Sequence, residues 1–203
     1  MKALLIVDVQ NDFTPGGALA VNEGDQIIPI INKIQGKFDL IVATQDWHPE
    51  NHGSFAANHT DKKVGDFIQL NGVMQILWPV HCVQESSGAE FHKDLNTSQV
   101  AKVFQKGTNP LVDSYSGFFD NNKNGDTGLS DYLKSEGVRE IYVCGLAADY
   151  CVKFTVLDGI DEGFKTYLIQ DATRAVNVKE GDFEKALEEM EDHGAFLINS
   201  KEL

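Results

Sequence analysis

The chain has 203 residues, of which 31 are acidic and 17 are basic, for a formal net charge of −14. This length suffices for one sizeable core and is short of the length at which chains usually split, so we expect a single domain over residues 1–203. An acidic surface repels phosphate backbones and anionic lipid headgroups, which argues against nucleic-acid and membrane partners.

The cellular location is predicted from the apolar runs. The first run, over residues 3–7, meets Asp8 before it reaches signal-peptide length, and no later run approaches a membrane span. We therefore expect a cytoplasmic protein. Its three cysteines, Cys82, Cys144 and Cys151, cannot all pair, and free thiols are expected. The sequence leaves open whether the chain forms a homo-oligomer.

Short apolar segments alternate with helical segments along the chain. Strands are predicted over residues 3–7, 40–44, 101–105, 140–144, 166–170 and 195–198. Helices are predicted over residues 25–35, 128–136, 149–162 and 182–193. Strands that are apolar throughout are typical of a sheet buried on both faces. The alternation therefore predicts an α/β fold, with a mainly parallel sheet of about six strands between two layers of helices.

Two segments, residues 45–100 and 106–127, are too long to be simple connections in a compact domain. The first contains Asp46-Trp47-His48-Pro49 and Trp78-Pro79-Val80-His81-Cys82. Aromatic residues and histidines at this density are not typical of disordered sequence. We interpret this segment as an excursion that builds a site.

Polar residues end several predicted strands, at the edge where open parallel sheets bind ligands. Asp8, Asp46 and Lys106 occupy such positions. Each also has an ordinary interpretation, such as a structural cap for Asp8 and a surface lysine for Lys106. Cys151 falls in the first turn of a predicted helix, where unpaired N–H groups favour a reactive thiolate. The alternative is a small buried apolar residue, which suits Cys144 inside a strand.

A metal site is indicated by Asp46 and His48, whose side chains project to the same side of an extended backbone. His81 is the candidate third ligand, and two imidazoles with one carboxylate leave positions open for water or substrate. The alternative is that these are surface loop histidines, which is the interpretation for His52, His59, His92 and His193. Phe13 and Trp78 are candidates for the walls of a pocket for a flat aromatic substrate, or belong to the core.

Taken in order, these segments resemble the isochorismatase-like cysteine hydrolases, and within them the nicotinamidase branch. The resemblance covers nearly the whole chain. It is carried by residues 5–13 (LIVDVQNDF), 44–49 (TQDWHP), 78–82 (WPVHC), 106–107 (KG) and 143–151 (VCGLAADYC).

The resemblance implies a Rossmann-like three-layer α/β/α fold and assigns roles to individual residues. The implied catalytic triad is Asp8, Lys106 and Cys151, and the implied metal ligands are Asp46, His48 and His81. A cis peptide bond is expected before Ala147, whose N–H forms an oxyanion hole with that of Cys151. Phe13, Trp78 and Ala147 are the implied substrate contacts. Zinc is the expected metal, with iron and manganese as alternatives. Some relatives place an additional histidine or acidic ligand in the loop after Pro49, where this chain has Asn51-His52-Gly53-Ser54, and the resemblance leaves open whether Ser54 approaches the metal through water.

The implied activity is hydrolysis of nicotinamide to nicotinate and ammonia through a cysteine thioester, in NAD salvage, with pyrazinamide as a further substrate. One alternative is another small-amide or carbamoyl hydrolase of the same family. A second is a non-catalytic metal-binding module. A nucleotide-binding oxidoreductase is disfavoured, because Asp8-Val9-Gln10-Asn11-Asp12 stands where a glycine-rich phosphate loop would be needed.

Overall fold

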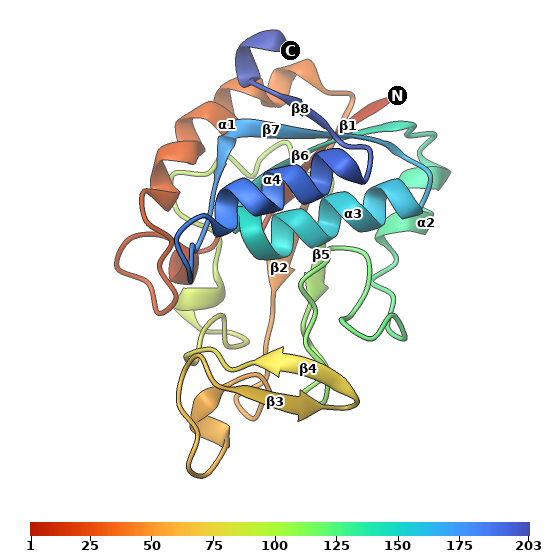
Figure 1. Ribbon diagram of the computed structural model, residues 1–203. Coiled ribbons are helices and arrows are strands. Elements are labelled where there is room, and N and C mark those ends of the chain that lie inside the picture. The colour runs from red at the N-terminus through yellow and green to blue at the C-terminus, as the bar shows by residue number, and fades with distance from the viewer.

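The computed structural model describes residues 1–203 and is built around a six-stranded sheet (Figure 1). Its strands are β1 (Lys2–Val7), β2 (Leu40–Asp46), β5 (Lys102–Lys106), β6 (Glu140–Leu146), β7 (Lys165–Arg174) and β8 (Phe196–Ile198). They lie in the order β5-β2-β1-β6-β7-β8, and every neighbouring pair is parallel. The predicted strands and parallel sheet are confirmed, although β7 continues to Arg174, past its expected end.

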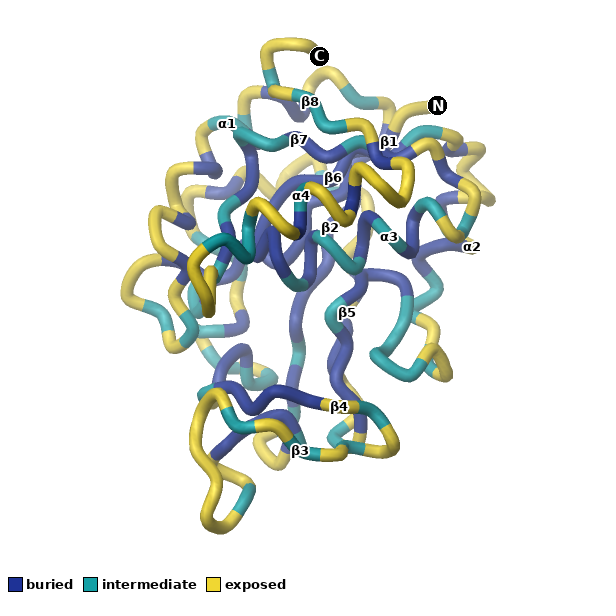
Figure 2. Tube along the Cα trace, in the orientation of Figure 1, coloured by how far each residue is buried: buried dark blue, intermediate teal, exposed yellow.

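Helices cover both faces of the sheet, which confirms the three-layer α/β/α architecture. The helices are α1 (Ile28–Ile34), α2 (Leu129–Ser135), α3 (Lys153–Asp161) and α4 (Asp182–Asp192). Successive β1 side chains point to opposite faces. Leu5 and Val7 pack in the core beneath α2, α3 and α4, whereas Leu4 and Ile6 pack against α1. The central strands β1, β2 and β6 are therefore buried on both faces, whereas the edge strands β5 and β8 are partly exposed (Figure 2).

Helix α1 is shorter than predicted. Its apolar residues Ile28, Ile31 and Ile34 are buried, as the helical pattern requires. The turn before it, Gly24–Ile27, is a 3₁₀ helix in which the Ile28 N–H donates to the Asp25 carbonyl. Pro29 stands where an α-helical turn would need a donor for that carbonyl, and proline has no N–H. The α-helix therefore begins only at Ile28.

The chain runs from β1 to β2 and β5 on one side, and then to β6, β7 and β8 on the other. The carboxyl ends of β1 and β6 thus lie where the strand order reverses, the usual place for a ligand site in such sheets. A hairpin of β3 (Phe67–Leu70) and β4 (Val73–Ile76) lies beyond this edge (Figure 1). It was not predicted, although its turn residues, Asn71 and Gly72 with positive φ, form a strong hairpin signal.

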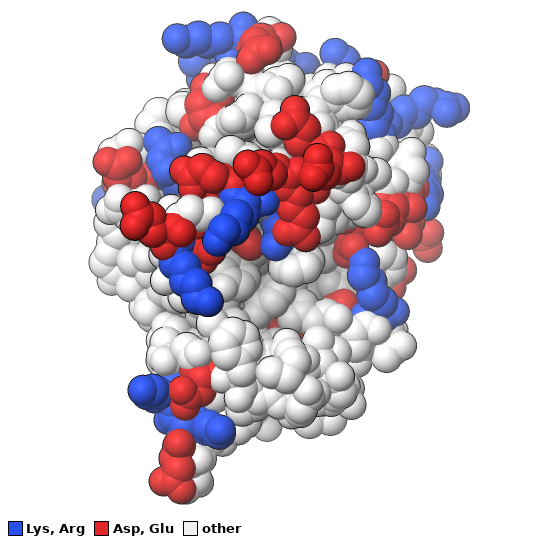
Figure 3. Space-filling view, viewed as in Figure 1, with Lys and Arg blue, Asp and Glu red and all other residues white.

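The cysteines are unpaired, and charge is unevenly distributed over the surface. Cys82, Cys144 and Cys151 are all free and buried. Acidic side chains gather over α4, whereas the face around β4 carries few charged groups (Figure 3). None of the helices combines the length and the apolar character needed to cross a bilayer.

Candidate active site

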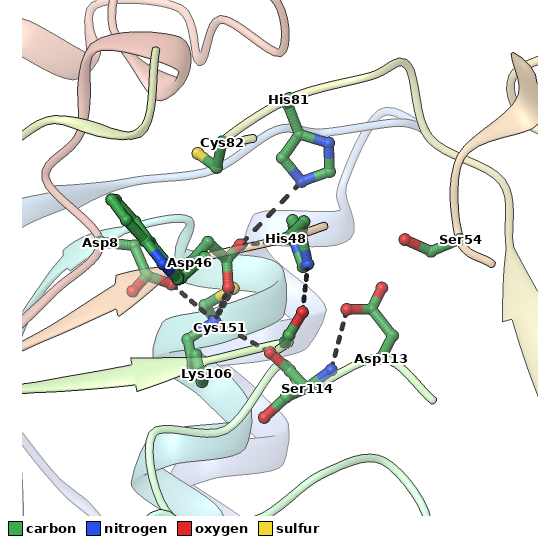
Figure 4. Close-up of polar contacts among 12 residues, drawn as sticks. Asp8, Asp46, His48, Ser54, His81, Cys82, Lys106, Asp113, Ser114 and Cys151 are labelled. Carbon is green, nitrogen blue, oxygen red and sulfur yellow. Dashed lines mark hydrogen bonds and ion pairs between the residues drawn. The ribbon is translucent and has the colours of Figure 1, made fainter. Parts of the chain in front are cut away.

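Lys106, at the end of β5, is the centre of a buried polar cluster (Figure 4). Its Nζ lies 2.8 Å from Asp8 Oδ2, 2.5 Å from Asp46 Oδ1 and 3.4 Å from Cys151 Sγ. It also donates to the Ser114 carbonyl at 2.9 Å. The ammonium group of Lys106 therefore brings together Asp8 and Asp46, from the ends of two other strands, and Cys151, from the turn after β6.

The two carboxylates keep this buried lysine charged. Burial alone would lower the pKa of Lys106, but the charges of Asp46 and Asp8 raise it well above its ordinary value. An unpaired buried charge would be very costly, whereas a fully paired one can be tolerated. Lys106 is therefore an ammonium ion throughout the neutral pH range and is not a snorkelling surface lysine.

Asp8 follows β1 in a left-handed conformation, with φ 47°, which is uncommon outside glycine. Its Oδ1 accepts a hydrogen bond from Thr44 Oγ1 at 2.7 Å. Its Oδ2 faces Lys106 Nζ but accepts no well-directed hydrogen bond. Burial raises the pKa of Asp8 to about 6, with Lys106 opposing and Asp46 adding to the rise. Asp8 thus has a carboxylate oxygen available to take a proton near neutral pH.

Cys151 lies in a π-helical turn, Ala148–Val152, that leads from β6 into α3. The peptide bond between Leu146 and Ala147 is cis, as the family resemblance implied. Burial raises the pKa of the Cys151 thiol well above its ordinary value, and Lys106 is the neighbour that lowers it. The helix terminus does not by itself yield a thiolate here, so the proton must leave to a base. Sγ lies within 4.8 Å of a carboxylate oxygen of Asp8.

A second cluster shares Asp46. His48 Nε2 lies 3.5 Å and His81 Nε2 lies 4.0 Å from Asp46 Oδ2. The other ring nitrogens, both Nδ1, lie 2.8 Å from the carbonyls of Gly107 and Pro79. A carbonyl only accepts, so each Nδ1 carries a proton, and Nε2 is the ring nitrogen that each histidine turns toward the carboxylate and would offer to a metal when the ring is neutral. Three electron-rich atoms that face one another in a buried place fit a bound divalent cation.

Gly107 allows this arrangement. It has φ 65°, and a Cβ at this position would lie 2.3 Å from His48 Cε1. Only glycine lets the backbone carbonyl after β5 approach the His48 ring closely enough to accept its N–H. The pair Lys106-Gly107 therefore serves both clusters, the lysine through its ammonium group and the glycine through its carbonyl.

The structure corrects the expectation that His52 is a surface histidine. His52 is fully buried, its ring lies 4.4 Å from that of His48, and its Nε2 has no hydrogen-bond partner. Its Nδ1 lies 2.7 Å from Ser54 Oγ and accepts the Ser54 N–H at 3.2 Å. Ser54 is therefore engaged with His52, set apart from the Asp46 cluster in Figure 4. His193, in contrast, is exposed as expected.

A small cavity adjoins both clusters. Phe13, Trp78 and Ala147, the expected substrate contacts, line it together with Cys151 and His81. The sequence analysis missed other residues of its wall: Leu19, Asp113, Tyr115, Tyr150 and Val176. Tyr115 could have been identified from the sequence as a candidate, because it is an aromatic residue in a loop rich in glycine and asparagine.

Tyr115 and Tyr150 also line a wider groove between the hairpin and α4. That groove, of about 380 Å³, contains none of the predicted site residues. Trp78, which lines the cavity but not the groove, donates from Nε1 to the Tyr115 hydroxyl at 3.1 Å. We therefore place the candidate active site in the small cavity, which is lined by Cys151, Asp46 and His81 of the predicted site.

Comparison with known proteins identifies the family of the chain. The isochorismatase domain matches residues 2–202, almost the entire chain. The chain belongs to the isochorismatase family.

Within the family, the chain is similar to nicotinamidases and pyrazinamidases. The chain is 49% identical to the nicotinamidase of Escherichia coli, covering 97% of this chain and 93% of that protein. A nicotinamidase/pyrazinamidase structure from Acinetobacter baumanii superimposes with a TM-score of 0.96 at 46% identity, covering 99% and 97% of the two chains. The pyrazinamidase of Pyrococcus horikoshii, solved in complex with zinc, has a TM-score of 0.78 at 43% identity, with 98% of each chain covered.

Proposed function

We propose that this chain hydrolyses nicotinamide to nicotinate and ammonia, and pyrazinamide in the same way. The observation that carries the proposal is that Lys106 lies beside both Asp8 and Cys151, and that Cys151 also lines a cavity walled by Phe13 and Trp78. High identity to the E. coli nicotinamidase over nearly the whole length supports the choice of substrate.

Acylation begins with proton transfer from Cys151 Sγ to Asp8, while Lys106 stays protonated and stabilises the thiolate. The thiolate forms a bond to the amide carbon, and the carbonyl π electrons move onto oxygen. The N–H groups of Ala147 and Cys151 are proposed to hold this oxyanion, and loss of one such donor typically costs about 100- to 1,000-fold in rate. As the oxyanion collapses, the C–N bond breaks and Asp8 returns the proton to the leaving nitrogen, which departs as ammonia.

Deacylation uses the same carboxylate. Asp8 removes a proton from water, and the hydroxide attacks the thioester carbonyl. The C–S bond then breaks, and the thiolate takes the proton back from Asp8. One carboxylate therefore acts as base and as acid in turn, which suits a group whose pKa burial raises to about 6. The products are the regenerated thiol and nicotinic acid, which loses its carboxyl proton to water and leaves as nicotinate.

Asp46, His48 and His81 are the residues proposed to hold the metal. Zinc is the first choice, with iron and manganese as alternatives, because two imidazoles and a carboxylate suit all three. When bound, the metal supplies a Lewis acid for the ring nitrogen of the substrate. The zinc complex of the P. horikoshii pyrazinamidase supports zinc. The ring then lies between Phe13 and Trp78 in our proposal.

The wider setting is part of the same proposal. A single domain over residues 1–203 would carry out the reaction in the cytosol as a step of NAD salvage. The salvage role follows from the substrate and not from any one residue. The small-molecule partner is nicotinamide.

The test is ammonia release from nicotinamide by the zinc-loaded protein, beside Cys151→Ala and Cys144→Ala. Cys144 is an equally buried thiol in β6, 3.8 Å from the Leu5 carbonyl and away from Lys106. We expect the Cys151 variant to lose turnover and the Cys144 variant to retain it. Benzamide, which lacks the ring nitrogen, should be a poor substrate. Full activity in the Cys151 variant contradicts the proposed nucleophile.

A further inference from the structure

Strand β2 extends further than its neighbour β1. The last paired residues of the two strands are Val7 and Thr44, after which β1 leaves the sheet at Asp8. Strand β2 continues to Asp46, which has Lys106 of β5 as its register partner on the other side. The end of β2, with the proposed metal ligand, therefore lacks a neighbouring strand on the β1 side.

The side-chain amide of Gln10 occupies that place. Its Oε1 accepts the Asp46 N–H at 2.8 Å, and its Nε2 donates to the Asp46 carbonyl at 2.8 Å. A neighbouring strand would offer the same pair of partners. The Nε2 group also donates to the Ala89 carbonyl at 2.9 Å. Gln10 is fully buried, so both of its amide donors are committed to backbone carbonyls with no water to replace them.

The orientation of Asp46 matters because its two oxygens serve different partners. Oδ1 receives Lys106 Nζ at 2.5 Å, and Oδ2 faces His48 Nε2 at 3.5 Å. A small rotation of the Asp46 backbone would disturb both contacts together. Gln10 also connects to the proposed base, since its own N–H donates to the Asp8 carbonyl at 2.8 Å.

We propose that Gln10 is a positioning residue whose amide substitutes for the missing strand and sets the Asp46 carboxylate between Lys106 and the metal. This inference rests on the proposed function in one respect, namely that Asp46 is a metal ligand. Partners that orient a metal ligand from outside the coordination sphere typically contribute about 10- to 100-fold to metal affinity or activity. Neither a carboxylate nor an apolar group of this length can replace the amide, because the site requires a donor and an acceptor side by side.

Gln45 provides a matched control. Its Nε2 donates to the same Ala89 carbonyl, at 2.8 Å, and its side chain is also buried. It forms no hydrogen bond to the Asp46 backbone, and its Oε1 instead accepts from Gln105 at 3.2 Å. Replacing either glutamine by methionine removes a buried amide of similar size. Only the change at Gln10 removes the support of Asp46.

The experiment measures zinc affinity of the metal-stripped full chain by competition with a chromophoric chelator, for the unsubstituted protein, Gln10→Met and Gln45→Met. Thermal unfolding of the metal-free proteins is recorded alongside. We expect Gln10→Met to bind zinc about 10- to 100-fold more weakly, with Gln45→Met close to the unsubstituted protein. Both should lower the melting temperature, because each loses buried hydrogen bonds. A purely structural role for Gln10 would lower the melting temperature and leave zinc affinity unchanged.

Equal zinc affinity in the two variants overturns the inference while leaving the proposed function intact. Failure of the unsubstituted protein to bind zinc overturns the proposed metal site, and the inference with it. If Gln10→Met does not fold, Gln10→Asn takes its place, since it keeps the amide but is one methylene too short to reach Asp46. Undiminished zinc affinity in Gln10→Asn contradicts the positioning role.

Discussion

Asp46 and Lys106 are register partners at the ends of β2 and β5, and their side chains meet at 2.5 Å. The same ammonium group lies 3.4 Å from Cys151 Sγ, and the same carboxylate faces His48 and His81. This one ion pair therefore joins the proposed nucleophile to the proposed metal ligands. Disturbing either residue should affect both halves of the site.

Replacement of Lys106 by methionine should destabilise the protein and abolish turnover. The change leaves Asp8 and Asp46 as buried carboxylates without a counter-charge, and breaking such a pair typically costs about 3–5 kcal/mol. Urea unfolding monitored by circular dichroism measures the loss. Lys102→Met, at an exposed position of the same strand, is the control and should unfold close to the unsubstituted protein. Equal stability of the two variants contradicts the ion-pair account.

The pH dependence of kcat/KM should follow Asp8. Burial raises the pKa of Asp8 to about 6 from its ordinary 3.8, so the group is protonated below pH 6 and is a carboxylate above it. Because the base must be unprotonated to accept the thiol proton, kcat/KM should rise as pH increases from 5 to 7, approaching tenfold per unit on the acid side.

Thr44 offers a sharper test of that assignment. Its hydroxyl donates to Asp8 Oδ1 at 2.7 Å, which favours the charged carboxylate. Thr44→Val removes this donor with little change in volume, so the pKa of Asp8 should rise, and the increase of kcat/KM with pH should move to higher pH. Thr44→Ser keeps the hydroxyl and should leave the pH profile of kcat/KM unchanged. An unchanged pH profile in Thr44→Val would mean that a group other than Asp8 controls it.

Replacement of His81 by alanine should empty the metal site. The His81 ring contributes one of the electron-rich atoms that face Asp46 Oδ2, and its removal leaves two ligands. Metal content after dialysis, measured by atomic absorption, should fall well below one equivalent, and kcat/KM should fall with it. His193→Ala, at an exposed histidine near Asp161, should retain both. Full metal content in the His81 variant contradicts the ligand set.

Replacement of Gly107 by alanine should displace His48. The added Cβ would lie 2.3 Å from His48 Cε1, and the position has φ 65°. Gly163→Ala isolates the backbone effect, since Gly163 has φ 86° and nothing within 4 Å of the added Cβ. Both variants should lose about 1–2 kcal/mol from the left-handed backbone, but only the Gly107 variant should also lose zinc affinity. Calorimetry with a zinc titration distinguishes the two.

The local pattern of the chain predicted most of the fold. Six apolar runs became the six strands, and the four helical segments became α1 to α4. The same pattern marked Asp8, Asp46 and Lys106, because each ends a strand and the ends of parallel strands share one edge. These features are available from the sequence because periodicity and burial are properties of consecutive residues.

Contacts between segments far apart in the chain could not be predicted from the sequence. Nothing local distinguishes buried His52 from exposed His193, since each lies in a polar stretch; packing against His48 buries the former. Tyr115 and Asp113 join the cavity wall only because the 106–127 segment folds against the hairpin, where Gln75 donates to both side chains. The short Asn71-Gly72 turn was the one local signal available for that hairpin.

The sequence by itself determined which segments form strands and helices along the chain, because this depends on local hydrophobic periodicity. It thereby also determined which polar residues stand at the ends of the strands. The tertiary structure alone decided which side chains meet: that Lys106 serves two carboxylates, that both histidine rings donate through Nδ1, and that Gln10 completes the edge of β2. Such contacts depend on strand register and on close approach of segments far apart in sequence, to within a few ångströms. Hydrogen bonding is decided at that scale, and hydrophobic periodicity carries no information about it.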